Sequence, residues 1–144
     1  MIKIYELGML DNAVNVPDVK AIANTANYTF ITHDDEVYLV ANTINGDDAY
    51  MENAIIAKDD YLNLFLVRAW DTKELLIDAK HITFGDGETY ASDIVAGTTL
   101  LTIADDGTLQ IAADTPESGV YFKVTAKTVL TEQAVRAKII YIAT

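Results

Sequence analysis

The side chains that most often perform acid–base or metal chemistry are scarce in this chain of 144 residues. Histidine titrates near neutral pH, and His33 and His81 are the only two. His33 stands beside an acidic pair in a predicted turn, whereas His81 falls in a predicted strand. A metal site would require both to converge on a carboxylate, and the simpler interpretation is one surface histidine and one on a sheet face. Because the chain has no cysteine, disulfides, zinc–thiolate sites and thiol catalysis are excluded.

Serine and carboxylate chemistry also lacks a recognisable pattern. Neither Ser92 nor Ser118 lies in the Gly-x-Ser-x-Gly turn of serine hydrolases. Acidic residues occur as neighbouring pairs at positions 34–35, 47–48, 59–60 and 105–106. Neighbours on a strand point to opposite faces, so such pairs do not form acid–base dyads, and aspartate instead favours turns. We therefore predict a protein that is not an enzyme and uses no cofactor, with a carboxylate-only active site as the enzymatic alternative.

Two further features could bind a ligand. The oxygen-rich loops at residues 86–88 and 105–107 offer calcium ligands, although the aspartate spacing of an EF-hand is absent. Trp70, the only tryptophan, could stack on a sugar or dock on a partner; the alternative is a core tryptophan near a sheet edge. We predict no metal site, and calcium is kept as an alternative.

Composition narrows the class of partner. The formal net charge is -12 and the pI is about 4.3, so the chain should repel nucleic acids and anionic membranes. No signal peptide or membrane-spanning apolar run is visible. After residue 119 the charge balance reverses, with Lys123, Lys127, Arg136 and Lys138 against Glu132. This asymmetry could dock the chain on copies of itself or on a mixed-charge surface, and the alternative is ordinary scatter over a solvated sheet.

Two-residue alternation is the clearest structural pattern, and it is strongest over residues 98–142. Val120, Phe122, Val124 and Ala126 alternate with Tyr121, Lys123, Thr125 and Lys127. Because side chains alternate between the faces of a strand, this predicts a sheet with one dry and one polar side. Strands are predicted at residues 2–7, 28–32, 37–42, 50–57, 62–70, 75–84, 98–104, 108–112, 121–127 and 135–142. This spacing predicts an all-β fold, a single-domain β-sandwich or barrel.

Three local predictions complete this description. Residues 15–27 are the one plausible helical piece, because Pro17 suits a first helical turn and the alanines tolerate a helix. Residues 98–112 should form a hairpin about the glycine-ended loop at 105–107. The strand that begins at Leu62 is apolar on both faces, which predicts a central position. We treat residues 1–144 as one β domain, in which residues 1–27 could serve as an attachment or assembly arm.

The order of elements in the last half of the chain resembles that of a known family. A loop and strand beginning at residues 96–100 lead into a hairpin about Asp106-Gly107 and then to the strand at residues 120–124. A threonine-rich connection then leads to the last strand, within residues 128–140. This order is similar to small head decoration, or auxiliary capsid, proteins of tailed bacteriophages.

The resemblance implies a virion structural protein that binds the outer surface of an assembled capsid and stabilises it. Its partners would be the major capsid protein and further copies of itself on the capsid lattice, after assembly in the bacterial host cytoplasm. Attachment surfaces are often added at termini and loops, so we expect contacts there. The predicted partner-binding residues are Ile2, Ile4, Tyr5, Asp47, Asp48, Trp70 and Asp86.

The alternative function is a carbohydrate-binding β-sandwich module of a phage tail or fibre. It would need an exposed aromatic platform, such as Trp70 with Tyr61 or Tyr90, because sugars stack on aromatic rings. Binding to a glycan array, or a melting temperature that rises with calcium, would distinguish it from a capsid protein.

Overall fold

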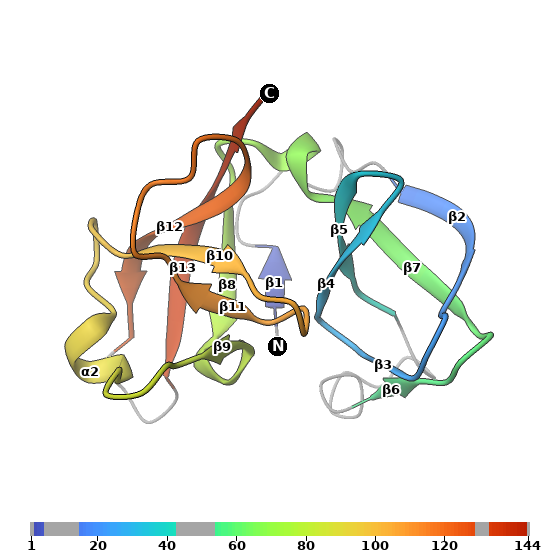
Figure 1. Cartoon of the computed structure of the whole chain (residues 1–144), viewed down its shortest axis with the longest axis horizontal. Helices are drawn as coiled ribbons and strands as arrows, with labels where there is room; N and C mark the ends of the chain where they lie inside the picture. Colours follow the sequence, from blue (N-terminus) through green and yellow to red (C-terminus); the bar gives the residue numbers. More distant parts are fainter. Residues whose placement is uncertain (1, 5–14, 43–53, 129–132, 144) are drawn as a thin grey trace.

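The computed structural model describes residues 2–4, 15–42, 54–128 and 133–143 (Figure 1). These residues form the predicted all-β fold, which is built from curled sheets. Helical structure in the described part is brief: the α-helix α2 (Tyr90–Asp93) and the 3₁₀ turns η1 (Val67–Trp70) and η2 (Ala79–His81). No helix in these ranges is long and apolar enough to cross a membrane.

The larger sheet has seven strands and is antiparallel except at one edge, where β11 and β9 run parallel. In spatial order its strands are β1 (Ile2–Ile4), β8 (Glu74–Asp78), β13 (Ala134–Ile142), β12 (Gly119–Lys127), β10 (Leu100–Ile103), β11 (Leu109–Ile111) and β9 (Ile82–Thr83). The predicted hairpin is confirmed as β10 and β11, and the last two predicted strands are β12 and β13, which pair with one another. A bulge between Val124 and Ala126 interrupts the alternation of β12.

The smaller sheet has four strands, in the order β2 (Asn15–Lys20), β7 (Tyr61–Leu66), β5 (Glu36–Val40) and β4 (Phe30–His33). A two-stranded ribbon, β3 (Thr25–Ala26) with β6 (Ile55–Ile56), lies at one end of it (Figure 1). β7 lies between β2 and β5, which confirms the predicted central strand. The strand is central because its alternate side chains enter two different apolar clusters.

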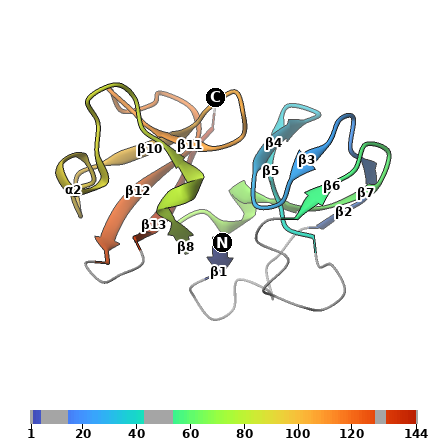
Figure 2. The ribbon, with the colours of Figure 1, turned by 90° about the horizontal axis from the view of Figure 1, so that it is seen from below.

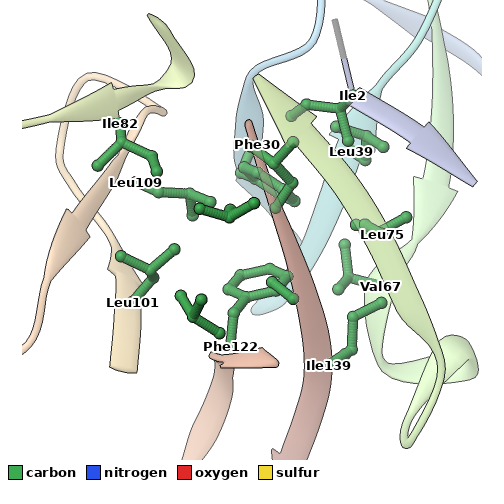
Figure 3. Close-up of a cluster of buried hydrophobic side chains, with 14 of the residues drawn as sticks. Ile2, Phe30, Leu39, Val67, Leu75, Ile82, Leu101, Leu109, Phe122 and Ile139 are labelled. Carbon is green, nitrogen blue, oxygen red and sulfur yellow. The ribbon is translucent and has the colours of Figure 1, made fainter. Parts of the chain in front are cut away.

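One hydrophobic core joins the two sheets. Phe30 and Leu39 of the smaller sheet belong to the same cluster of buried side chains as Leu101, Leu109 and Phe122 of the larger sheet (Figure 3). The rings of Phe30 and Phe122 lie 5.3 Å apart, centre to centre. A second cluster lies on the other side of the smaller sheet and contains Ala21, Tyr38, Val40, Ile56, Leu62, Leu64 and Leu66. The smaller sheet is therefore buried on both faces.

The adjacent aspartates form turns, as predicted for those in the described ranges. Asp34 and Asp35 join β4 to β5 with φ angles of 49° and 64°. Two consecutive positive φ angles match the right-handed twist of a two-residue hairpin, and aspartate tolerates this conformation better than most residues. Asp59, at φ 73°, turns the chain before β7. The pair at 47–48 lies outside the described residues.

The predicted helix over residues 15–27 is wrong. Val16 pairs with Leu64 and Val19 with Leu62, so this segment is strand β2 and then ribbon strand β3. Asp18, at φ 63°, lies in an irregularity between the two valines. The alanines that suggested a helix have only a weak preference, and pairing with a distant apolar strand outweighs it.

Two predicted strands end earlier than expected. The strand expected to reach Trp70 stops at Leu66 and continues as η1, and the strand expected over residues 75–84 is interrupted by η2. Both 3₁₀ turns change the direction of the chain. η1 connects β7 of the smaller sheet to β8 of the larger sheet, and η2 connects β8 to β9, which pair with different strands. Of the strands predicted at 2–7 and 50–57, the described parts are β1 and β6.

Candidate functional site

The histidines lie in separate elements. His33 ends β4, with its Nε2 3.4 Å from Asp34 Oδ2, while His81 lies in η2 rather than in the predicted strand. The ring of His81 packs edge-on against Tyr28, 6.1 Å between centres. Within the described ranges, no three histidine, aspartate or glutamate side chains gather as metal ligands.

The two loops considered for calcium use their carboxylates to close turns. Asp106 Oδ1 accepts hydrogen bonds from the Thr108 hydroxyl at 2.6 Å and the Thr108 backbone N–H at 3.0 Å. These bonds hold the pKa of Asp106 below its usual value, because they stabilise the charged form. Glu88 Oε1 accepts from the Gly85 N–H at 2.7 Å. Both loops are thus shaped by their own side chains.

Two predicted partner-binding side chains lie in the core, which corrects their assignment to a contact surface. Ile2 is 5% exposed and Trp70 is 1% exposed. The Trp70 ring stacks on Phe65 with 5.6 Å between centres, so the alternative of a core tryptophan is confirmed. Burial of large apolar side chains stabilises the fold and removes them from contact with a partner. Asp86 is exposed in a turn, and its role remains a prediction.

The remaining predicted contacts cannot be placed in the same way. Tyr5, Asp47, Asp48 and the side chain of Ile4 lie outside the described residues, although the Ile4 backbone pairs with Leu75. The aromatic platform proposed for sugar binding is not formed, because its central member, Trp70, is buried. The other two candidates are engaged separately: Lys20 Nζ lies 5.3 Å from the Tyr61 ring centre, and the Tyr90 hydroxyl donates to the Thr128 carbonyl at 2.6 Å.

The larger sheet buries one face and turns the other outward. Phe122, Val124 and Ile139 are fully buried, whereas Lys123, between the first two, is exposed. Residues directly opposite one another on neighbouring strands share a face, so the register defines the outward set. We call it the outer face: Glu74, Leu76, Leu100, Lys123, Arg136, Lys138 and Ile140; Tyr121 shares this face by register but is itself buried. It mixes apolar and charged side chains, as protein interfaces do.

The charge of the outer face is basic, although the chain is strongly acidic. Lys123 and Lys138 stand directly opposite one another on β12 and β13. Arg136 Nε lies 2.6 Å from Glu74 Oε2, and Lys138 is also paired in register with Glu74. A single acidic residue therefore faces three basic ones, and no described carboxylate forms an ion pair with Lys123. Like charges in direct opposition weaken a sheet, so this arrangement costs stability.

Lys127, the other basic residue of this region, does not belong to the outer face. Its Nζ donates to the Ala91 carbonyl at 3.1 Å and lies 5.2 Å from the Tyr90 ring centre. Lys127 thus holds α2 against β12. The basic segment predicted from sequence divides into a structural lysine and a cluster of three basic residues on one face.

A second surface feature is a cleft of about 480 Å³ at the junction of the two sheets. Residues 24–26, 29–32 and 105–107 line it, and we call it the β4 cleft. Its volume falls in the range of ligand sites, about 300–1,000 Å³. The turn of the β10–β11 hairpin forms one wall and β4 the other, and both views place these elements side by side (Figures 1 and 2).

The edge of the smaller sheet opens into the β4 cleft. β4 is the last strand of its sheet, and its backbone groups alternate between β5 and the open side. The Val40 N–H donates to the Thr29 carbonyl, whereas the Phe30 N–H points the other way and donates to the Gly107 carbonyl at 2.9 Å. By the same alternation, the backbone N–H and C=O of Thr32 point away from β5, into the cleft.

Comparisons of the chain with protein-family models, with curated proteins and with solved structures found no match. The outer face and the β4 cleft are therefore the features from which a function can be inferred. Of the residues that the structure describes, neither surface includes a histidine or a serine.

Proposed function

We propose that this protein is a non-enzymatic structural protein that binds the outer surface of an assembled phage capsid and stabilises it. The outer face carries the proposal: three apolar and three basic side chains grouped over β8, β10, β12 and β13, in a chain of net charge -12. A basic face on an acidic molecule orients the protein toward an acidic surface, because every other approach is repelled. Glu74 is the one acidic member of the set.

The resemblance to head decoration proteins supports the same proposal. The segments that carry it are β10, β11, β12 and β13, which follow one another in sequence and lie beside one another in the larger sheet. A protein that covers a lattice needs only a moderate interface per copy, because many sites on one particle add through avidity. The proposed partners are the major capsid protein and further copies on the lattice, at the virion surface.

Co-sedimentation with assembled phage heads that lack this protein tests the proposal. The mass of the free protein in solution is measured beside it. We expect saturable binding at a fixed ratio per capsid subunit, and heads that resist heat better once coated. A stable soluble monomer that leaves the heads bare at every concentration would contradict the proposal.

A pair of charge reversals tests the role of the outer face. Lys123→Glu should weaken head binding about tenfold or more, since it replaces a basic contact by a repelled one. Lys58→Glu is the matched control, because Lys58 is also exposed and lies in a turn at residues 58–60, outside the outer face. An equal loss in both variants would assign the effect to overall charge and exclude the outer face as the contact surface.

A further inference from the structure

We infer that the free edge of β4 binds an extended segment of another protein that carries lysine or arginine, and that this segment adds to the smaller sheet as a further strand. The inference goes beyond capsid binding by the outer face, because it concerns a different surface and a different kind of partner. It rests on three observations: the open backbone groups of β4, the room in front of them, and the charge at both ends of the strand.

The backbone geometry of β4 suits strand addition. Phe30 and Thr32 are the residues whose N–H and C=O groups face away from β5. The N–H of Phe30 already has a partner, the Gly107 carbonyl at 2.9 Å. The N–H and C=O of Thr32 are the next pair along the same edge, and Thr32 is exposed. An incoming strand would therefore exchange two hydrogen bonds with Thr32. These bonds would extend the row of backbone hydrogen bonds along the edge of β4, which begins with the bond from Phe30 to Gly107 at the hairpin tip.

Exposed edges attract unwanted strands, and proteins usually protect them with lysine, proline, bulges or a covering element. The four residues of β4 include neither lysine nor proline, and its pairing with β5 is regular. The hairpin tip covers only the start of the strand, at Phe30. The remainder lines the β4 cleft of about 480 Å³, which gives an extended segment room to approach.

The charge around β4 selects a basic segment. Asp105 and Asp106 line the cleft beside the start of the strand, and Asp34 and Asp35 follow its end. A lysine or arginine next to the residue that pairs with Thr32 would reach one of these carboxylates, which strengthens the bond and sets the register. Two copies of this edge would bring their acidic pairs together, so a second copy of β4 is the disfavoured partner.

A synthetic peptide tests the inference on the intact protein. The probe is a blocked nonapeptide in which lysine alternates with valine and threonine, titrated at millimolar concentrations. We expect it to slow hydrogen exchange of the Thr32 amide about tenfold or more, measured by NMR, because a bonded amide exchanges only after the strand leaves. The same peptide with an N-methyl group on every residue keeps the charge but cannot pair along either edge, and it should leave Thr32 unprotected.

Variants of the protein separate pairing from charge. Thr32→Pro removes the N–H that faces the cleft, and proline is tolerated on an edge strand. This variant should bind the peptide about tenfold more weakly, whereas Thr32→Val, which keeps the backbone donor, should bind as the natural protein does. Asp105→Asn, or glutamate in place of lysine in the peptide, should also weaken binding. Protection of Thr32 by the N-methylated peptide, or equal binding of both Thr32 variants, would overturn the inference. If Thr32→Pro does not fold, the peptide comparison alone decides.

Discussion

The two sheets of this protein bury their side chains in different ways. The larger sheet places Phe122, Val124 and Ile139 in the shared core and leaves the outer face in contact with water. The smaller sheet is apolar on both sides: Leu39 enters the shared core, whereas Leu64, on the neighbouring strand, enters the second cluster. The larger sheet can therefore bind through its outer face, and the smaller sheet can bind through the edge of β4.

The junction between the sheets explains how such different halves form one fold. At one point η1 carries the chain from β7 to β8 and buries Trp70 between them. At another, the hairpin tip of the larger sheet bonds through Gly107 to Phe30 of the smaller sheet. The bond between Gly107 and Phe30 joins segments that are far apart in the sequence. Because these contacts join the two sheets, we expect the sheets to unfold together.

The largest expected effect on stability comes from truncating one large side chain in either hydrophobic cluster. Phe122→Ala should destabilise the protein by about 3–5 kcal/mol and Leu64→Ala by about 2–5 kcal/mol, because each leaves a cavity among fully buried side chains. If the halves form one cooperative unit, both variants show a single unfolding transition. Denaturant titration followed by Trp70 fluorescence, which reports on the shared core, and by far-ultraviolet circular dichroism measures this.

Lys123→Ala provides the control for that experiment. Lys123 is the exposed neighbour of Phe122 on the same strand, so its replacement should change stability by no more than about 0.5 kcal/mol. Two separate transitions in Leu64→Ala, with the Trp70 signal unchanged in the first, would show that the smaller sheet unfolds alone. That result would contradict the single shared core as the source of stability.

A smaller effect should follow from a methyl group at the hairpin tip. Gly107 has φ +85°, and a Cβ there would lie 2.8 Å from the Phe30 carbonyl oxygen. Gly97 has nearly the same φ, +84°, but its Cβ would meet nothing within 4 Å. Gly97→Ala should therefore cost about 1 kcal/mol from backbone strain alone, and Gly107→Ala about 2–3 kcal/mol. If thermal unfolding shows that the two variants lose equal stability, the contact between the hairpin tip and the smaller sheet shifts to accommodate the methyl group without a further loss of stability.

The parts of the fold that depend on neighbours in sequence were predictable. The turn at residues 105–107 and the alternation around Phe122 are local patterns, and each produced the expected strands. The segment after Asn15 was assigned wrongly because its partner, β7, lies far along the chain. Local preference is weak compared with such pairing, and the residues themselves do not show which distant strand they will meet.

The candidate surfaces were harder to predict than the fold. The reversal of charge after residue 119 was visible, but only the register places Lys123 opposite Lys138 and assigns Lys127 to α2. Trp70 was considered as a contact because a single tryptophan is ambiguous until its burial is known. The β4 edge left no signal in the sequence, since an edge exists only once the order of strands is fixed.

The smallest effect should appear at low pH, in the turn that forms one wall of the β4 cleft. Hydrogen bonds from the hydroxyl and then the backbone N–H of Thr108 lower the pKa of Asp106. A carboxyl whose pKa is depressed on folding stabilises the protein above its unfolded pKa, about 3.9, and loses that contribution as the pH falls through the folded value.

Asp106→Asn should lower the melting temperature by about 1–2 °C at neutral pH, because Asp106 is exposed and screened. The deficit should shrink as the pH drops below about 4. If the melting temperature of Asp106→Asn is lowered by the same amount at every pH, the charge of Asp106 does not contribute to the stability of the turn.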